Sequence, residues 1–152
     1  MFSISEVDKG DSELARLVSE LDAFQSELYP AESNHCLDLS TVNEEQLRCV
    51  IVHDEGGTPA GCGALLFQAD GSAEIKRVYI RPQYRGRKLG EQILSAIETI
   101  ASEKNSFLLR LETGIHQLPA IALYRNCGFK ICDAFPPYAA DPLSVFMYKE
   151  LP

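Results

Sequence analysis

The chain has 152 residues, the size of one domain, since single domains commonly hold about 100–200 residues. Hydrophobic residues make up 45% and charged residues 24%, a balance typical of a globular protein and not of a disordered one. The net charge of −8 disfavours nucleic acid as a partner, because binding to a phosphate backbone requires a basic surface. The same charge mildly favours a cationic partner.

Neither a membrane span nor a signal peptide is predicted. No apolar run approaches the roughly 18 residues of a membrane span, and the first residues lack the basic-then-apolar layout of a signal peptide. We therefore expect a cytoplasmic protein without a membrane partner.

The five cysteines favour reduced thiols in a core. Their number is odd and no two are spaced as Cys-x-x-Cys, so neither a zinc site nor a redox dithiol is expected, and no metal is predicted. A nucleophilic role for Cys127 or Cys132 beside a histidine is the weaker alternative.

The N-terminal third begins with a strand and a helix. Alternating side chains over residues 1–8 predict a short strand. From Ser12, apolar residues recur at spacings of three and four, which predicts an amphipathic helix that ends near Tyr29-Pro30. The polar segment 31–38 is expected to be a loop, and loops of this kind often carry specificity.

The rest of the chain alternates strands and helices. The runs Arg48–His53 and Ala60–Gln68 flank a Gly-Gly turn and predict an antiparallel hairpin. The remaining predicted elements, in chain order, are a strand at Ala73–Ile80, a helix at Leu89–Ala101, a strand at Phe107–Glu112, a helix at Pro119–Asn126 closed by Gly128, and strands at Phe129–Cys132 and Ser144–Lys149. This order predicts a mixed sheet with helices on both faces.

The segment Arg85–Gly90 carries the clearest chemical signal, because it leads from a strand through a tight turn into a helix. The first N–H groups of a helix have no internal partners and bind anions, assisted by the helix dipole. Gly86 and Gly90 would let a phosphate approach the backbone, while Arg85, Arg87 and Lys88 would add charge. A diphosphate fits such a site, and neither a GxGxxG nor a GxxxxGK[ST] motif is present to indicate a dinucleotide or a nucleoside triphosphate.

Two segments carry a resemblance to a known family. The first is the motif Arg/Gln-x-x-Gly-x-Gly/Ala, which falls on Arg85–Gly90 with Lys88 in place of the middle glycine. The second is the run Ala-Ile-x-Leu-Tyr-x-x-x-Gly-Phe, which falls on Ala120–Phe129. With these segments the sequence resembles the GNAT superfamily of N-acetyltransferases over most of its length, and most strongly from Ala60 to Lys130.

The resemblance implies a single N-acetyltransferase domain over residues 1–152 with the α/β fold of that family. Its central sheet would be mixed but mostly antiparallel, with about six or seven strands. The sheet would splay between the strands Glu74–Ile80 and Phe107–Glu112, and acetyl-CoA would lie in the gap. The residues implied in cofactor binding are Val78, Tyr79 and Ile80 for the pantetheine arm, Arg85, Gly86, Arg87, Lys88, Leu89 and Gly90 for the pyrophosphate, and Gln117 in the place of a frequent asparagine.

The implied reaction is direct transfer of the acetyl group to a primary amine of a small molecule or peptide. Tyr124 matches the tyrosine that protonates the departing thiolate, and the Val78 N–H would stabilise the oxyanion. Glu74 is the first candidate for the general base, although it could equally be a cross-strand charge partner. Glu112, another carboxylate or a water could take its place.

The acceptor is expected to bind near loops and element ends around the open side of the splay. The residues nominated for this site are Tyr29, His35, Asp38, Glu112, His116 and Tyr138. The loop Phe135–Pro142 is rich in Pro and could act either as a lid or as a static wall.

Two other readings stay open. A non-catalytic module that binds or senses acyl-CoA would retain Arg85–Gly90 but would not need Tyr124. A nucleotide-binding regulatory domain would bind ATP or NAD in preference to CoA. The sequence identifies neither the acceptor nor the oligomeric state, although GNAT proteins are often dimers.

Overall fold

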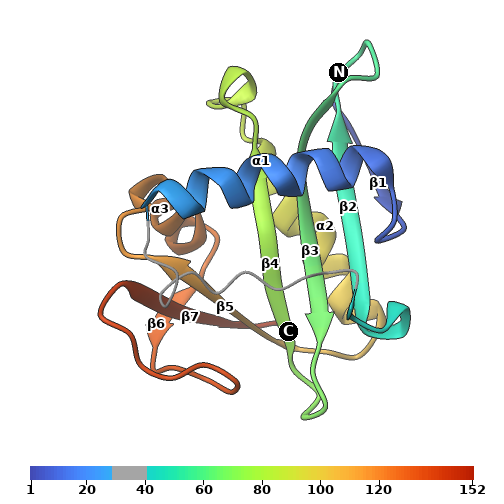
Figure 1. The fold of residues 1–152 in the computed structure, drawn as a ribbon. Helices are drawn as coiled ribbons and strands as arrows, with labels where there is room; N and C mark the ends of the chain where they lie inside the picture. The colour runs from blue at the N-terminus through green and yellow to red at the C-terminus, as the bar shows by residue number, and fades with distance from the viewer. Residues whose placement is uncertain (29–40) are drawn as a thin grey trace.

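The computed structural model describes residues 1–28 and 41–152 of the chain. These residues form a seven-stranded sheet in the order β1-β2-β3-β4-β5-β7-β6 (Figure 1). The strands are β1 Ser3–Val7, β2 Leu47–His53, β3 Pro59–Phe67, β4 Ala73–Ile80, β5 Leu108–Gly114, β6 Lys130–Cys132 and β7 Ser144–Glu150. Neighbouring strands are antiparallel except for β4 and β5, which are parallel. The predicted mixed, mostly antiparallel sheet is therefore confirmed.

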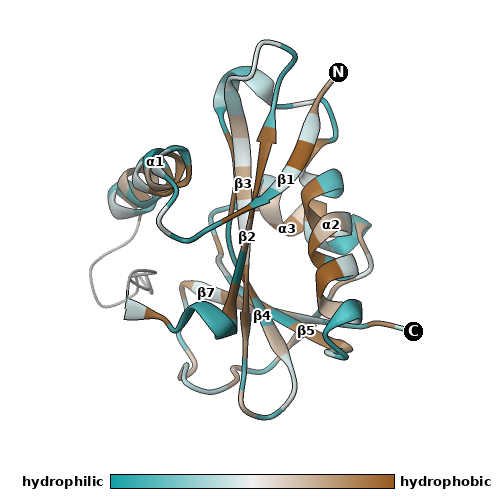
Figure 2. Ribbon diagram, turned by 90° about the vertical axis from the view of Figure 1, so that its right-hand side faces the viewer, coloured by the Kyte–Doolittle hydropathy of each residue, from teal (hydrophilic) through white to brown (hydrophobic). Residues whose placement is uncertain are grey.

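Helices cover both faces of the sheet, as expected. Helix α1 (Ser12–Leu28) lies on one face, and α2 (Leu89–Glu103) and α3 (Leu118–Asn126) lie on the other (Figure 2). Short 3-10 turns at Glu44–Gln46 and Pro82–Tyr84 precede β2 and α2. No helix among the described residues is long and apolar enough to cross a membrane.

The apolar spacing read from the sequence places each helix on the sheet. In α1 the buried side chains are Leu14, Leu17 and Leu21, which follow the predicted stripe. The helix starts after Asp11, whose carboxylate accepts the backbone N–H groups of Glu13 and Leu14 at 2.9 and 3.1 Å. The described part of this helix ends at Leu28, so its predicted end at Tyr29-Pro30 lies outside the described residues.

Two apolar cores fill the layers between helices and sheet. The larger core joins α2 and α3 to the sheet and includes Ile75 of β4 and Leu109 and Leu111 of β5. The smaller core lies under α1 and includes Tyr79 of β4. Side chains of a strand alternate between its faces, so Glu74, Arg110 and Glu112 lie on the face that α1 partly covers.

Strands β4 and β5 are paired only at their beginnings. Their register joins Ala73–Ile75 to Leu109–Leu111, and within the described ranges no later residue of β4 has a partner on β5. This divergence is the expected splay. Its open end lies toward the C-terminal ends of both strands, where an open parallel sheet commonly binds ligands.

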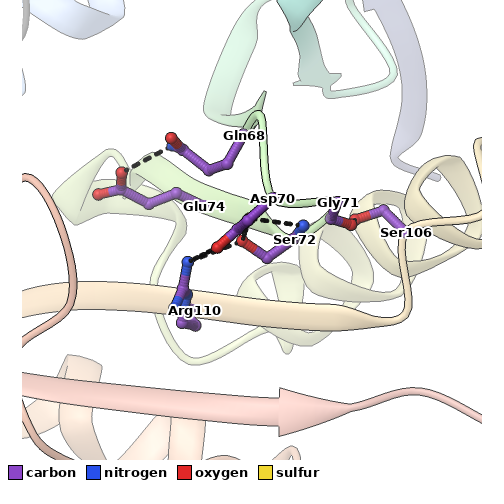
Figure 3. Close-up of polar contacts among 7 residues, drawn as sticks. All are labelled: Gln68, Asp70, Gly71, Ser72, Glu74, Ser106 and Arg110. Carbon is purple, nitrogen blue, oxygen red and sulfur yellow. Dashed lines mark hydrogen bonds and ion pairs between the residues drawn. The ribbon is translucent and has the colours of Figure 1, made fainter.

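A polar network ties the two strands together at the closed end of the splay (Figure 3). Arg110 Nη2 on β5 donates to the Asp70 carboxylate at 2.9 Å and to the Ser72 hydroxyl at 2.8 Å. The Ser106 hydroxyl donates to the Gly71 carbonyl at 2.8 Å. The turn that leads into β4 is therefore held against β5 just before the strands separate.

A β-bulge in β4 changes which side chains face the open part of the sheet. The register with β3 shifts between Cys62 and Ala64, and Arg77 has a positive φ of 56°. The buried Arg77 side chain reaches the α1 face, where its Nε lies 3.2 Å from an Asp22 carboxylate oxygen. After the bulge, Val78 packs toward the α2 core and Tyr79 toward the α1 core.

Candidate active site

A cleft of about 450 Å³ opens where β4 has left β5. Its walls are the end of β4, the turn and first residues of α2, one face of α3, and the β5–α3 turn. Helix α1 closes another side with Leu21 and Phe24. Segments far apart in the sequence therefore meet around one hollow, which lies where the cofactor was expected.

All of the predicted cofactor residues except Arg87 line this cleft. The lining includes Val78, Tyr79, Ile80, Arg85, Gly86, Lys88, Leu89, Gly90 and Gln117. The Arg87 guanidinium instead lies 5.9 Å from the centre of the Phe2 ring and 6.0 Å from that of Tyr84. Arg87 therefore contacts the neighbouring aromatic pair, while the motif around it faces the cleft.

Gly86 opens the turn for a ligand. Its φ of +81° lies in the left-handed region, which glycine adopts without steric cost. A Cβ at this position would have no atom within 4 Å, so the space beside the backbone is open. The Arg85 guanidinium is tied back to the strand, because its Nε donates to the Ile80 carbonyl at 3.1 Å.

The backbone conformation at Lys88 is one that favours glycine, the residue found at this position in the family motif. As the N-cap of α2 it adopts φ 60° and ψ 26°, a left-handed conformation that is unfavourable for a residue with a Cβ. Its side chain makes no capping hydrogen bond and is exposed at the cleft. The chain therefore keeps a strained backbone and places a cation at the mouth of the cleft.

Gly90 also has a packing role that its sequence motif does not reveal. A Cβ at Gly90 would lie 2.7 Å from Leu123 Cδ2 on α3. The missing side chain therefore lets α2 and α3 approach closely. Gly90 also lines the cleft, so its expected place at the phosphate stays a prediction.

These features suit a diphosphate linked to an extended arm. The fifteen-residue helix α2 directs its first N–H groups and the positive end of its dipole to the cleft, with Arg85 and Lys88 beside them. Beyond Ile75, the β4 edge has no partner on β5 in the described parts of both strands. An extended amide chain could therefore bond to this edge as an added strand.

Tyr124 on α3 lines the same cleft and is 7% exposed. Its ring lies edge-on to Phe129, with ring centres 5.8 Å apart. Burial raises the pKa of the Tyr124 hydroxyl, and the nearby Cys127 and Glu112 raise it further. The hydroxyl therefore keeps its proton at neutral pH and can donate it.

Glu74 does not line the cleft. It is 2% exposed, with Lys76 Nζ at 3.0 Å and the Tyr138 hydroxyl donating to the same carboxylate oxygen at 2.5 Å. Gln68 Nε2 approaches the other oxygen at 3.5 Å (Figure 3). The expected charge partner of Glu74 is Lys76. Glu74 also contacts Tyr138, which was nominated for the acceptor site. Its role as the base stays a prediction.

The nominated acceptor residues separate into three groups. His116 lies in the β5–α3 turn and lines the cleft. Glu112 and Tyr138 lie on or against the open face of the sheet, outside the cleft lining. The nominated residues Tyr29, His35 and Asp38 lie outside the described residues.

Some residues near the site carried no functional signal in the sequence. Phe24 belongs to the apolar stripe of α1, which predicted core, yet it is 42% exposed and lines the cleft with Leu21. Lys76 was missed as well, although it follows Glu74 at the two-residue spacing that places side chains on one face of a strand.

The described cysteines, Cys49, Cys62, Cys127 and Cys132, do not form a second site. Within residues 1–28 and 41–152, no cysteine lines the cleft and no His, Cys, Asp and Glu side chains cluster as metal ligands. Desolvation raises the pKa of the thiols of Cys127 and Cys132, which disfavours the reactive thiolate. The described cysteines are free thiols, as expected.

The same architecture occurs in known acyltransferases. The family model "Acetyltransferase (GNAT) family" matches residues 14–129. An IAA acetyltransferase from Azospirillum brasilense is 42% identical over 91% of this chain and 90% of its own length. A solved structure from Klebsiella pneumoniae, assigned as an acyl-CoA N-acyltransferase, has a TM-score of 0.91 and 42% identity, covering 99% of this chain and 98% of its own.

A more distant structure shares the fold alone. It is an aminoglycoside 6'-N-acetyltransferase complexed with coenzyme A, with a TM-score of 0.71 and 17% identity, covering 97% of this chain and 96% of its own. The fold, the cleft and the close relatives define an acyltransferase. The chain belongs to the GNAT acetyltransferase family.

Lys88→Gly tests two properties of this position, the strain of its left-handed backbone and the charge of its side chain. We expect the free energy of unfolding to rise by about 0.5–1 kcal/mol, because relief of the left-handed strain exceeds the entropy that glycine adds to the unfolded chain. The dissociation constant for CoA should rise about fivefold, since one cation is lost from the cleft. Urea denaturation and calorimetry measure the two effects.

Asn105→Gly is the matched control, because Asn105 also has a positive φ, 58°, but lies beyond the other end of α2. It should leave the affinity for CoA unchanged. If Lys88→Gly bound CoA as tightly as the parent protein, the assigned role of its cation would be contradicted.

Proposed function

We propose that the protein is an N-acetyltransferase that moves the acetyl group of acetyl-CoA directly to a primary amine of a small molecule or peptide. The observation that supports this most is the shared cleft, in which the Tyr124 hydroxyl, the open edge of β4 and the N-terminus of α2 come together. Acetyl-CoA supplies an activated thioester, and the remaining steps belong to side chains and main-chain groups of this chain.

The cofactor-binding residues would position the donor from both ends. The N–H groups that open α2, with Arg85 and Lys88, would hold the pyrophosphate. The main chain of Val78 and Ile80 would bond the pantetheine arm, because the β4 edge is open there. Gln117 lies at the N-cap of α3 and lines the cleft, which supports the proposal that its amide contacts the arm.

The bulge in β4 supports an oxyanion site at Val78. Arg77 and Val78 stand opposite Gly63 where the register with β3 shifts, so the regular hydrogen-bond ladder is interrupted there. We propose that the Val78 N–H donates to the oxygen that becomes negative as the carbonyl is attacked.

Tyr124 would protonate the departing thiolate. Its raised pKa keeps the phenol protonated at neutral pH, while its place in the lining gives it access to the cleft. Direct transfer is favoured over an acyl-enzyme, because no cysteine, serine or threonine of the described residues lines the cleft.

The acceptor class follows from charge and from the relatives' names. The net charge of −8 favours an amine that carries a positive charge in solution. The names of an IAA acetyltransferase and of an aminoglycoside 6'-N-acetyltransferase point to small molecules for those proteins. A small amine acceptor is therefore the first class to test.

Thiol release from acetyl-CoA tests the proposed function. The purified protein should release CoA thiol when polyamines, amino acids, aminoglycosides or peptides with a free N-terminus are screened, and only with an acceptor present. Tight binding of CoA with no acceptor-dependent release would favour the non-catalytic sensing module. Preferential thermal stabilisation by ATP or NAD would contradict the assignment of the cleft.

Tyr124→Phe isolates the acid step. Because the phenol acts only on the leaving thiolate, we expect kcat to fall about 100-fold while the dissociation constant for acetyl-CoA stays within about twofold. Steady-state kinetics and calorimetry give the two values. An unchanged kcat would remove the tyrosine from the mechanism, and loss of binding would assign it to the cofactor site instead.

A further inference from the structure

Two carboxylates lie on the open face of the sheet beside the splay, Glu74 on β4 and Glu112 on β5. In β5, Leu109 and Leu111 belong to the core under α2, so Arg110 and Glu112 face the other way. Glu74 alternates in the same sense with Ala73 and Ile75. Both carboxylates could in principle serve an acceptor on this face, and their surroundings distinguish them.

The Glu74 carboxylate is engaged in holding a loop. The Lys76 ammonium contacts it at 3.0 Å and also donates to the Tyr138 hydroxyl at 2.7 Å. The Tyr138 ring packs edge-on against Phe135, with ring centres 5.3 Å apart, and its hydroxyl donates back to Glu74. A proton taken up by Glu74 would break a buried ion pair and weaken the anchor of the β6–β7 connection.

Arg110 does not neutralise the charge of Glu74. Its guanidinium is turned away from Glu74 toward Asp70 and Ser72 in the turn before β4 (Figure 3). It also lies 4.7 Å from the centre of the Phe135 ring. Lys76 is therefore the cation that neutralises Glu74, and the two form a structural pair beneath the loop.

Glu112 lies one residue beyond the last pairing of β4 and β5. Its backbone is held from the other side, opposite Phe146 of β7, and the Ser144 hydroxyl donates to its carboxylate at 2.8 Å. The side chain is partly exposed. It stands on a rigid strand at the point where the sheet opens, which is suitable for a group that must meet a reacting atom.

The charge of Glu112 acts on both sides of the splay. Burial is the main cause that raises the pKa of Tyr124, which lines the cofactor cleft, and that of Tyr138 in the β6–β7 connection, and the charge of Glu112 raises both further. Glu112 is therefore electrostatically close to the group that protonates the leaving thiolate and to the expected acceptor side. A carboxylate at the point where the two strands separate is suitably placed to take a proton from an entering amine.

We infer that Glu112 is the general base that takes the proton from the acceptor nitrogen, and that Glu74 is a positioning residue that fixes Tyr138 and its loop. This inference rests on the proposed acetyl transfer. It names the group that completes the reaction at the same site.

The proton balance closes within the site. The acceptor ammonium first releases one proton to solvent. The neutral amine then attacks the thioester carbonyl, a C–N bond forms, and Glu112 takes the second proton that the nitrogen must lose. The C–S bond breaks, its electron pair goes to sulfur, and Tyr124 gives its proton to the thiolate. Transfer of a proton through water from Glu112 to the Tyr124 phenolate restores both residues, so no other reactant is required.

Several charged or titratable groups lie on the described elements next to the part of β5 that carries Glu112. They are Arg110 on its own strand, Glu74, Lys76 and Arg77 on β4, Tyr124 on α3, Tyr138 in the β6–β7 connection and His116 after β5. A pH profile of a single variant therefore reports on coupled groups, and the experiment needs a more selective measurement.

The test compares Glu112→Gln and Glu74→Gln, with Glu150→Gln as control. Glu150 is an exposed carboxylate at the other end of the β5–β7 pair. Glu112→Gln keeps the size of the side chain and can still accept from Ser144, so it should bind CoA as the parent does but lose about 100-fold or more in kcat. Glu150→Gln should stay within about twofold of the parent.

Chemical rescue identifies the base. Added formate should restore acceptor-dependent thiol release to Glu112→Ala, because a small carboxylate can occupy the vacated position, and it should not restore Glu74→Ala. Should the alanine variant not fold, Glu112→Asp replaces it. That variant should then exceed Glu112→Gln in kcat at unchanged CoA affinity.

Three outcomes would overturn the inference. They are a kcat of Glu112→Gln within about threefold of the parent, rescue of Glu74→Ala by formate, and equal kcat values for Glu112→Asp and Glu112→Gln. Failure of the parent protein to release thiol with any amine would instead contradict the proposed function itself, so the two failures are distinguishable.

Discussion

The separation of β4 from β5 after Ile75 is the constraint on which the rest of the site depends. Before that point the strands are paired, and Arg110 holds the turn before β4 against β5. After it, the bulge at Arg77 interrupts the regular ladder with β3, which resumes at Tyr79. A strand edge that has no neighbouring strand, as β4 has on its β5 side after Ile75 in the described residues, would be unfavourable in a closed core. It becomes useful where an extended ligand can pair with it, and the helix N-terminus and Tyr124 border the same opening.

Much of this architecture could be predicted from the sequence. The three- and four-residue spacing of leucines and isoleucines located α1 and α2, and β-branched runs between glycine turns located most of the strands along the chain. The cofactor segment was recognisable because its chemistry depends on local backbone features, a turn that leads into a helix. Short motifs of this kind keep their geometry wherever the flanking strand and helix form. Tyr124 was recognisable because it lies within the family run Ala120–Phe129, which is continuous in the sequence.

Features that depend on long-range packing could not be predicted. The clash that a Cβ at Gly90 would make with Leu123 exists only when α2 and α3 meet, so no local pattern reveals that Gly90 also serves helix packing. Tyr138 bonds to Lys76 and Glu74, which precede it by 62 and 64 positions in the sequence. A burial pattern along one strand cannot reveal such a partner. The two candidates for the base, Glu74 and Glu112, could therefore be compared only through their contacts in the folded chain.

A crystal structure with bound CoA tests the central claim most directly. The account predicts the pantetheine arm along the open edge of β4, with amide bonds to the main chain of Val78 and Ile80. It also predicts the pyrophosphate at the N–H groups that open α2, and the sulfur beside the Tyr124 hydroxyl. CoA bound elsewhere, or a β4 edge closed by β5 when CoA is present, would contradict it.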